Sequence, residues 1–376
     1  MHRRKNKILF LANIPTPYRV CFFNELGKLC DLTVLFERKT SNYREPSWFN
    51  NNFIGFKAVF LKGTNINKSK AVCFNVKKYL KKELFDIIII GGYESLTDML
   101  AINYLKFKRI PFILNADGGF INRDESCFKR AIKRYYISSA DFWLSTGKIT
   151  NSYLKNYGAN PKAIFIYPIT TRLQKEIIKD PIDNKIRRNL RDNLNICEEK
   201  VILSVGQFIH RKGFDILLKA CEKIPKEYGV YIVGGKPTQD YLVLKKKLEL
   251  SNVHFIGFRS KEELKEYYMA SDLFVLPTRE DIWGLVINEA MAYGLPVITT
   301  DNCIAGLELV KDYENGFIIP VEDETTLANK INEILTDDDL RTKMAKNSLM
   351  KIKHYTIENM AKLHIRIFNN FLEYEK

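Results

Sequence analysis

Short apolar stretches alternate with amphipathic stretches along almost the whole chain, and this alternation constrains the fold more than any other feature. The stretch FDIIIIGG contains four consecutive isoleucines between an aspartate and two glycines, which is typical of a strand buried on both faces. Alternating strands and helices predict an α/β fold with parallel, doubly wound sheets. We expect strands at Lys7–Ala12, Leu32–Phe36, Asp86–Ile90, Phe112–Ala116, Phe142–Ser145, Ile164–Ile166, Val201–Val205, Val230–Val233, His254–Ile256, Leu273–Leu276, Val297–Thr299 and Gly316–Ile319. We expect helices at Tyr18–Leu29, Lys129–Ser139, Phe214–Ile224, Tyr241–Leu250, Glu262–Ala270, Leu285–Tyr293 and Ile357–Tyr374.

The strands fall into two series, and a polar, charge-rich stretch that contains DPIDNKIRRNLRDN separates them. A chain of 376 residues is long enough for two domains at about 150 residues each. We therefore expect a first domain at 1–170, a linker at 171–200 and a second domain at 201–356. The final amphipathic segment, 357–376, follows the second sheet and is expected to return to the first domain.

The chain is strongly basic, with 59 lysines and arginines against 44 acidic residues and a net charge of +15. Such an excess fits nucleic acid, an anionic membrane or a phosphorylated substrate, although it also occurs without a structural reason. No nucleic-acid recognition motif appears, so we expect no nucleic-acid partner. The stretches LKKELF and FKRAIKRYY are expected to be helical and to contact an anionic membrane peripherally; solvated helix faces are the alternative.

The cysteines and the apolar stretches indicate the cellular compartment of the protein. The seven cysteines are scattered and include no CxxC pair, which argues against a zinc site and against a disulfide framework. No apolar stretch approaches the roughly 18 residues that a membrane span needs. We therefore expect a cytoplasmic protein.

Acidic residues and a glycine crowd the start of one expected helix, in the sequence REDIWGLVINEAMAYGLPVITT. Ligands of doubly wound sheets bind beyond the carboxyl ends of the strands, and the free N–H groups of a helix start favour an anion. The carboxylates of Asp281 and Glu289 can accept hydrogen bonds from vicinal hydroxyls. This pattern predicts a diphosphate between a sugar and a ribose. The alternative is that Glu280 and Asp281 only stabilise the helix N-terminus.

The loop after the expected strand Val201–Val205 offers a cation for the same diphosphate. It reads GQFIHRKGF, in which Gly206 permits a tight turn and Lys212 stands just before a helix opened by Gly213. A lysine beside free helix N–H groups can bind phosphate. A solvated loop lysine is the alternative.

The sequence EDIWGLVINEAMAYGLPVITT resembles the signature of the family 4 glycosyltransferases of GT-B fold. In that signature an acidic residue is followed, after seven residues, by a glutamate and then by an AMAxGxPV run. The resemblance implies two Rossmann-like domains that face each other across a cleft. It also implies transfer of a sugar, with retention of configuration, from a nucleotide diphosphate sugar such as a UDP-sugar. The acceptor would be a glycan or lipid-linked glycan of a cell-surface polysaccharide, and no cofactor is implied.

By position in this signature, Asp281 or the adjacent Glu280 would meet the donor sugar and act in catalysis together with Lys212. Glu289 would hold the ribose. The family's G-R-x4-K-G pattern appears here with Gln207 in place of the arginine, and Arg211 is the nearest residue to replace that charge. The resemblance further implies that the diphosphate and nucleotide contact the backbone of Gly284, Leu285 and Val286 and the strand-end residues Gly206, Gly234, Phe258 and Arg259.

The first domain is expected to bind the acceptor. Tyr18 and Arg19 follow a proline-stiffened loop, and Glu94 and Gly118 lie just after other expected strands. The family's first-domain histidine is expected to be absent, because we count only His2 in that domain. Asp117 would take its catalytic place, unless it is simply an Asp-Gly turn residue.

No convincing DxD sequence appears, so we expect turnover without a metal. A nucleotide-sugar epimerase or hydrolase of the same fold is the alternative enzyme. A basic nucleic-acid-binding protein is the alternative from another class.

Overall fold

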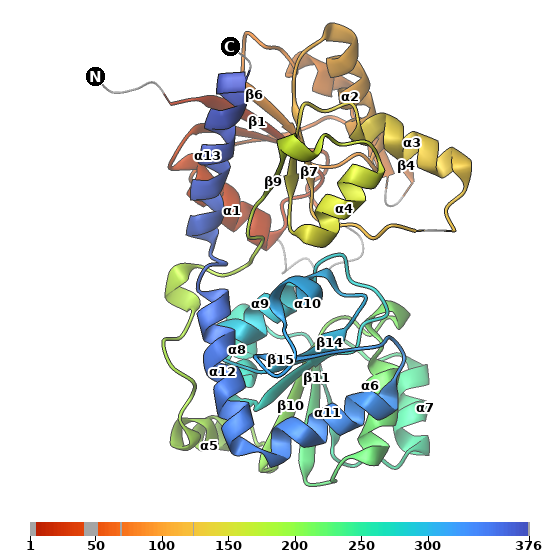
Figure 1. Ribbon diagram of the computed structural model, residues 1–376, viewed down its shortest axis with the longest axis vertical. Coiled ribbons are helices and arrows are strands. Elements are labelled where there is room, and N and C mark those ends of the chain that lie inside the picture. The colour runs from red at the N-terminus through yellow and green to blue at the C-terminus, as the bar shows by residue number, and fades with distance from the viewer. Residues whose placement is uncertain (1–4, 41–51, 68–69, 123, 375–376) are drawn as a thin grey trace. The chain divides into compact units, whose positions relative to one another are not determined.

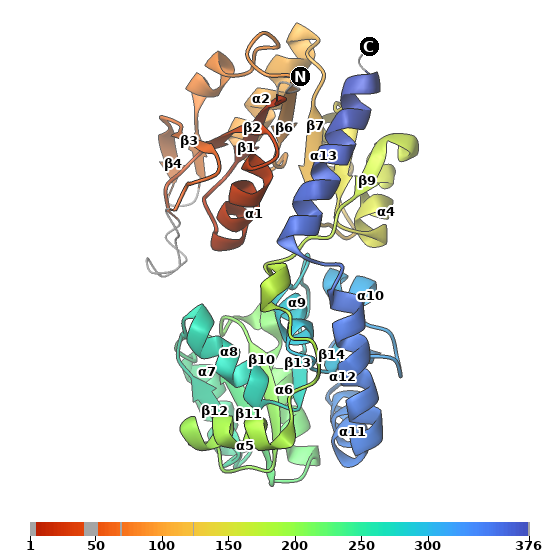
Figure 2. The same cartoon turned by 90° about the vertical axis from the view of Figure 1, so that its left-hand side faces the viewer.

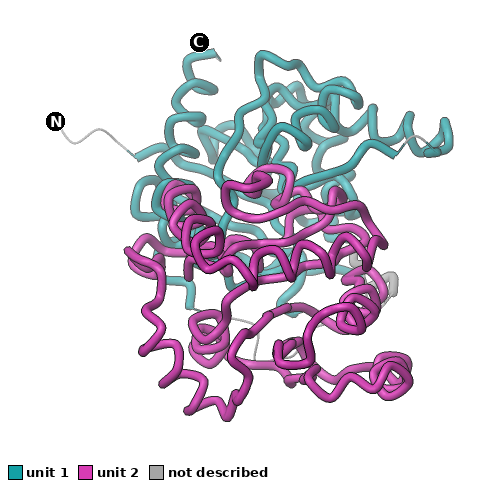
Figure 3. The backbone as a smooth tube through the Cα atoms, turned by 60° about the horizontal axis from the view of Figure 1, so that its bottom comes forward, with its two compact units in different colours: residues 1–171, 356–376 teal, residues 172–355 magenta. Residues whose placement is uncertain are grey.

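The computed structural model describes residues 5–40, 52–67, 70–122 and 124–374. The chain folds into two compact units (Figure 3). Unit 1 comprises residues 1–171 together with 356–376, and unit 2 comprises residues 172–355. The chain thus leaves unit 1, builds all of unit 2 and then returns to unit 1.

Unit 1 contains a seven-stranded sheet in the order β3-β2-β1-β6-β7-β8-β9, in which every pairing is parallel (Figure 1). The strand order reverses between β1 and β6, and such a topological switch point is where doubly wound sheets bind ligands. The four isoleucines of β6 are all buried, as the sequence predicts. The strands are β1 (Lys7–Ala12), β2 (Asp31–Phe36), β3 (Lys57–Phe60), β6 (Ile87–Ile90), β7 (Ile113–Ala116), β8 (Phe142–Ser145) and β9 (Ile164–Ile166), with a separate antiparallel hairpin of β4 (Thr64–Asn67) and β5 (Lys70–Val72).

The last helix of the chain packs against the first (Figures 1 and 2). The ring of His364 lies 4.7 Å from the ring of Phe22, and Phe371 lies edge-on to Phe142 of the sheet at 5.0 Å. The first helix begins with a proline, whose fixed φ suits that position. The helices of unit 1 are α1 (Pro17–Gly27), α2 (Leu96–Lys108), α3 (Cys127–Ile137), α4 (Lys148–Asn156) and α13 (Ile357–Tyr374), with 3-10 turns η2 (Phe74–Lys78) and η3 (Pro161–Ala163).

Unit 2 contains a six-stranded parallel sheet in the order β12-β11-β10-β13-β14-β15, with its switch point between β10 and β13. One face of this sheet packs on α6, α7 and α11 and forms a large apolar core. The strands are β10 (Lys200–Val205), β11 (Tyr228–Val233), β12 (Val253–Ile256), β13 (Leu273–Leu276), β14 (Val297–Thr300) and β15 (Gly316–Ile319). The helices are α5 (Asn184–Asn193), α6 (Phe214–Ala220), α7 (Gln239–Lys247), α8 (Lys261–Ala270), α9 (Leu285–Ala292), α10 (Ile304–Leu309), α11 (Glu324–Thr336) and α12 (Asp338–Ile352), with 3-10 turns η4 (Gln174–Glu176), η5 (His210–Lys212) and η6 (Cys221–Lys223).

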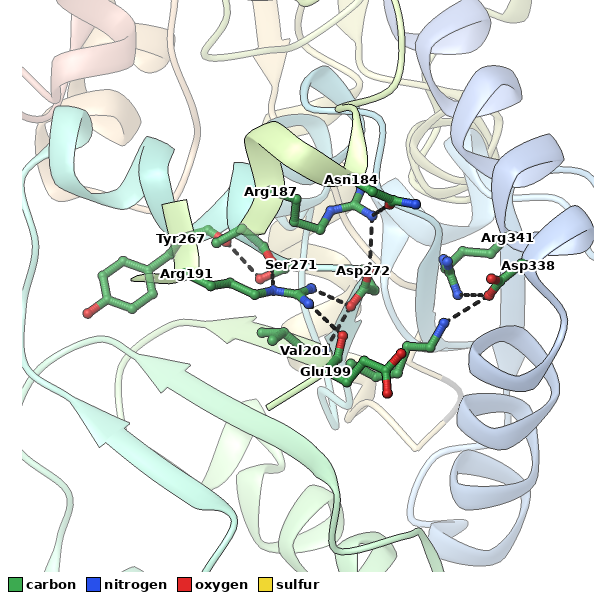
Figure 4. Close-up of polar contacts among 12 residues, drawn as sticks. Asn184, Arg187, Arg191, Glu199, Val201, Tyr267, Ser271, Asp272, Asp338 and Arg341 are labelled. Carbon is green, nitrogen blue, oxygen red and sulfur yellow. Dashed lines mark hydrogen bonds and ion pairs between the residues drawn. The ribbon is translucent and has the colours of Figure 1, made fainter. Parts of the chain in front are cut away.

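A buried ion cluster joins α5 to Asp272, the residue before β13, within unit 2 (Figure 4). Arg191 donates to Asp272 at 2.6 Å, and Arg187 donates to the other carboxylate oxygen at 3.0 Å. Asp272 also accepts a hydrogen bond from the amide of Val201 at the start of the sheet. The structure therefore places residues 172–200, for which the sequence predicts a linker, within unit 2.

The structure differs from the sequence-based expectations at two further places in unit 1. The edge strand β3 and the β4–β5 hairpin were not predicted; β3 is only partly buried, so it lacks the continuous apolar pattern of a central strand. The stretch LKKELF, which we expected to be helical, forms a turn between η2 and β6. FKRAIKRYY does lie on a helix, α3.

Candidate functional site

The loops after β10 and β13 are held together at the switch point of unit 2. Gly213 has a φ of 66°, and a Cβ added there would lie 2.0 Å from the carbonyl oxygen of Pro277. The carbonyl of Arg211 accepts hydrogen bonds from the amide of Arg279 and the hydroxyl of Thr278, both at 2.8 Å. Only glycine permits this close approach, which brings the two predicted motifs into one site.

Lys212, Arg211 and Asp281 form a charged cluster between these loops. The Nζ of Lys212 lies 2.6 Å from Oδ2 of Asp281, and Nη1 of Arg211 lies 3.3 Å from Oδ1. Arg211 also donates to the backbone carbonyl of the exposed Glu280 at 2.7 Å. The Lys212 side chain is 12% exposed and that of Arg211 is 46% exposed. Two cations therefore share one carboxylate, and one of the cations reaches solvent.

Arg279 is not part of this cluster, but it connects neighbouring segments of the site. Its guanidinium forms two hydrogen bonds to the carboxylate of Asp215, at 2.9 and 2.7 Å, and a third to Glu322 at 2.6 Å. It also donates to the carbonyl of His210 at 2.7 Å. The sequence motif contains Arg279, but only the fold brings Asp215 and Glu322 to it.

The start of α9 lies beside the charged cluster. Gly284 has a φ of 94°, and a Cβ there would lie 2.9 Å from Sγ of Cys303. The amide of Asp281 donates to the carbonyl of Asn302, and the carbonyl of Asp281 accepts from the amide of Ile304. The loop is thus fixed on both sides. Leu285 and Val286 stand in the first helical turn, where amides have no partner within the helix and attract anions.

Glu289 lies further along α9, where its carboxylate is held by side chains from other segments. The hydroxyl of Tyr268 donates to Oε2 at 3.0 Å, and Nη2 of Arg172 lies 3.5 Å from the same oxygen. Neither partner was predicted, because neither belongs to a motif.

The remaining predicted residues of unit 2 lie at strand ends. Gly206 and Gly234 touch: a Cβ on Gly234 would lie 1.8 Å from the carbonyl oxygen of Gly206. Gln207 is exposed in the loop after β10. Phe258, 46% exposed, and Arg259 follow the edge strand β12, two strands away from β10.

In unit 1 the structure joins two residues predicted for acceptor binding and catalysis. Arg19, at the start of α1, forms an ion pair with Asp117, which follows β7. Asp117 also accepts hydrogen bonds from Asn115 at 2.8 Å and Tyr167 at 3.1 Å. Burial alone would raise the pKa of Asp117, but the Arg19 guanidinium and the hydrogen bonds from Asn115 and Tyr167 together hold the pKa below its usual value.

Three other residues predicted for unit 1 lie around this ion pair or in neighbouring loops. The Tyr18 hydroxyl accepts a hydrogen bond from Arg19 at 3.3 Å. Gly118 follows Asp117, and the exposed Glu94 follows β6.

The expectation that only His2 belongs to the first domain is wrong, because His364 of α13 lies in unit 1. His364 is 1% exposed, and its ring lies 4.7 Å from that of Tyr167. Its Nδ1 donates to the carbonyl of Met360, and burial lowers its pKa to about 4. With Arg19 and Asp117, His364 lines a small pocket in unit 1. The predicted return of 357–376 to the first domain already implies this placement, but the count of first-domain histidines leaves that segment out.

Within the residues that the structure describes, no three His, Cys, Asp or Glu side chains are grouped to hold a metal ion. None of the helices formed by those residues is both long and apolar enough to cross a membrane. Turnover without a metal remains a prediction.

Comparison with known proteins identifies the relatives of this chain. The family described as "Glycosyl transferases group 1" matches residues 186–350. An uncharacterized glycosyltransferase of Haemophilus influenzae is 32% identical over 176 residues, which cover 45% of this chain and 49% of the relative. An N,N'-diacetylbacillosaminyl-diphospho-undecaprenol alpha-1,3-N-acetylgalactosaminyltransferase of Campylobacter jejuni is 22% identical over 80% of this chain and 81% of its own length. The match thus spans about half the length of the first curated relatives.

Solved structures extend the likeness to both units. HepE of Anabaena, solved in complex with UDP, has a TM-score of 0.79 at 17% identity and covers 97% of this chain and 100% of its own. Sucrose-phosphate synthase of Thermosynechococcus elongatus has a TM-score of 0.75 at 20% identity and covers 98% and 100%. These likenesses confirm the predicted α/β class and GT-B fold. Residues 186–350 of this chain are similar to the group 1 glycosyl transferases.

Proposed function

We propose that this chain transfers a sugar from a UDP-sugar to a lipid-linked saccharide acceptor, with retention of configuration and without a metal, in the synthesis of a cell-surface polysaccharide. The observation that carries this proposal is the cluster of Lys212 and Arg211 around Asp281, beside the start of α9. Two relatives support it. HepE was solved with UDP, and the Campylobacter jejuni relative is named for transfer to an undecaprenol-linked saccharide.

The cluster suits a diphosphate leaving group. When the bond between the anomeric carbon and the diphosphate oxygen breaks, negative charge develops on the phosphate. Lys212, Arg211 and the amides at the start of α9 can neutralise that charge. A diphosphate that takes over Lys212 would release the carboxylate of Asp281, which can then accept hydrogen bonds from the donor sugar. The acceptor oxygen bonds to the anomeric carbon on the face that the phosphate leaves, and its proton passes to a phosphate oxygen.

Chromatographic assay of a panel of UDP-, GDP- and dTDP-sugars tests this proposal. Each donor is incubated alone, with a lipid-linked saccharide extract, and with extract plus EDTA. We expect a new glycolipid and free UDP only when the acceptor is present, unchanged by EDTA, with the anomeric configuration retained in the NMR spectrum of the product. Consumption of donor without acceptor would identify an epimerase or hydrolase instead. Failure of all these donors to bind would overturn the proposal.

We further propose that unit 1 meets its acceptor at an anionic membrane through an α2–α3 surface, formed by Lys106, Phe107, Lys108, Phe128, Lys129, Arg130, Arg134 and Tyr135. In α3 only Ile137 is buried, and the helix carries four basic and no acidic residues. Phe128 is 75% exposed and Tyr135, two turns later, is 45% exposed. On α2, Phe107 is 80% exposed, and the Nζ of Lys106 lies 4.0 Å from the centre of the Tyr135 ring.

Exposed aromatic rings among basic residues are typical of helices that bind anionic membrane surfaces. Flotation with vesicles of phosphatidylcholine alone, or with phosphatidylglycerol added, tests this surface. We expect binding only to the anionic vesicles, reduced at least fivefold by combining Lys129→Gln with Arg130→Gln. Lys246→Gln with Lys247→Gln on α7 removes the same charge from unit 2 and should leave binding unchanged. Equal losses in both variants would show that net charge, rather than this surface, governs binding.

A further inference from the structure

The carboxylate of Glu289 is oriented by two side chains, and both of the contacts described above fall on Oε2. The Tyr268 hydroxyl donates to it at 3.0 Å, and Nη2 of Arg172 lies 3.5 Å away. One hydrogen bond and one ion pair on the same oxygen restrict rotation of the carboxylate and so define how it can face a ligand.

Arg172 is itself fixed by aromatic rings. Its side chain is 3% exposed, and its Cζ lies 5.3 Å from the centre of the Tyr293 ring. Tyr293 stacks on Tyr268 at 5.5 Å with an angle of 18° between the rings. Arg172, Tyr293, Tyr268 and Glu289 therefore form a closed ring of contacts. A buried guanidinium is costly unless it is paired, so this ring should favour a single arrangement.

Arg172 lies at the point where the chain passes from unit 1 to unit 2. Arg172 is the first residue of unit 2, directly after Thr171 of unit 1. The segment that follows is held on α9, because the amide of Ile178 donates to the carbonyl of Ala292 at 3.1 Å. The segment that leaves unit 1 thus contributes a side chain to Glu289.

We infer that Arg172 is a positioning residue of the nucleotide subsite. It holds Glu289 in the orientation in which the carboxylate accepts hydrogen bonds from the 2′ and 3′ hydroxyls of the donor ribose. This inference rests on the proposed function, since it requires a nucleotide donor. A carboxylate that is free to rotate would lose its preference for a ribose over a sugar without these hydroxyls, while contacts to the base and diphosphate would remain.

Calorimetric titration of the full chain with UDP and with 2′,3′-dideoxy-UDP tests this inference. We expect wild type to bind UDP at least tenfold more tightly than the dideoxy compound. Arg172→Gln should reduce this preference to less than about threefold and should change the Kd of the dideoxy compound by less than about twofold. Arg172→Lys keeps the charge and should recover part of the preference. Tyr268→Phe removes the hydrogen bond to Oε2 and should reduce the preference independently of any effect at Arg172.

Arg191→Gln is the matched control, because Arg191 is another buried arginine of unit 2 that pairs with a carboxylate, Asp272. It should lower the melting temperature and leave the ribose preference unchanged. Absence of UDP binding by wild type would overturn the proposed function. An unchanged preference in folded Arg172→Gln and Arg172→Lys, or equal weakening of both ligands, would overturn the inference alone. If Arg172→Gln does not fold, Arg172→Lys decides, and an unchanged preference in that variant would overturn the inference.

Discussion

In unit 2 the switch point places two cations, Lys212 and Arg211, against one carboxylate, Asp281, whereas in unit 1 the single cation Arg19 pairs with Asp117. Both sheets are parallel and both reverse their strand order between two central strands. In each unit the cation follows the strand that comes first in the sequence, β1 or β10. The aspartate follows a strand that lies beyond the reversal of strand order, β7 or β13. The two ion pairs therefore occupy similar topological positions with a different balance of charge.

The groups around the two ion pairs also differ in charge. In unit 1 the neutral donors Asn115 and Tyr167 complete the coordination of Asp117, and His364 lies against Tyr167. In unit 2 the neighbour is the start of α9, whose amides add positive potential. The comparison teaches that one topology can present a site with a net positive charge or a site with no net charge, depending on whether the cations outnumber the carboxylates.

Of the changes that test this comparison, replacing Lys212 should have the largest effect. Lys212→Ala removes the cation closest to Asp281. In the proposed function Lys212 stabilises the leaving diphosphate, so the variant should lower kcat/KM with the preferred UDP-sugar about 1000-fold. Steady-state assay measures this change. Arg19→Ala, the equivalent change in unit 1, should alter the Kd for UDP by less than about twofold. A Lys212→Ala enzyme within tenfold of wild type would remove Lys212 from the site.

Replacing Asp117 should test whether the ion pair of unit 1 contributes to stability. Asp117→Ala leaves the mostly buried Arg19 guanidinium without its carboxylate and should lower the free energy of unfolding of unit 1 by about 3 kcal/mol. Hydrogen exchange of the β1 and β7 amides measures this loss. Adding Arg19→Ala should recover part of it, because no buried charge then remains. A loss below about 0.5 kcal/mol would contradict this account.

Lowering the pH should reduce the free energy of unfolding of unit 1 through the protonation of His364. Burial lowers its pKa to about 4 from an ordinary value of 6.5, so the unfolded chain takes up the proton first as the pH falls. The stabilising contribution is full above about pH 6.5 and is lost towards pH 4; by pH 5 the loss is about 2 kcal/mol. Burial also raises the pKa of Asp98 to about 7, which acts in the opposite direction, so a variant must isolate the histidine.

His364→Phe provides that variant, because the aromatic rings of Phe22, Tyr167 and Phe368 already surround the site. Urea unfolding at pH 7 and pH 5 should show that wild type loses about 2 kcal/mol more than His364→Phe over this interval. Equal losses in the two proteins would refute the assignment.

Adding a charge at position 207 should have the smallest effect. Gln207→Arg places a third cation near the cluster and should tighten UDP binding about threefold, since exposed charge contacts contribute less than about 1 kcal/mol. Gln239→Arg adds the same charge at the start of α7 and should leave the affinity unchanged. The gain at position 207 should shrink in 0.5 M salt. A gain that persists in high salt would contradict an electrostatic origin.

The sequence predicts the central strands well because they are short, apolar and buried on both faces, as β6 illustrates. It does not predict β3, a partly exposed edge strand. For the site, the two motifs predict that Lys212 and Asp281 lie together, and the structure agrees at 2.6 Å. Arg172 and Tyr268 could not be predicted, because their contacts with Glu289 depend on tertiary packing rather than on a local pattern.

The return of α13 to unit 1 has a consequence for synthesis on the ribosome. Unit 2 is made from one continuous stretch and can fold as soon as that stretch emerges, whereas the partner of α1 emerges only after residue 356. Until then the buried faces of Phe22 and Phe142 lack their native cover from α13. We therefore expect nascent chains that end near residue 355 to recruit chaperones through unit 1, and ribosome profiling of chaperone-bound chains would detect this.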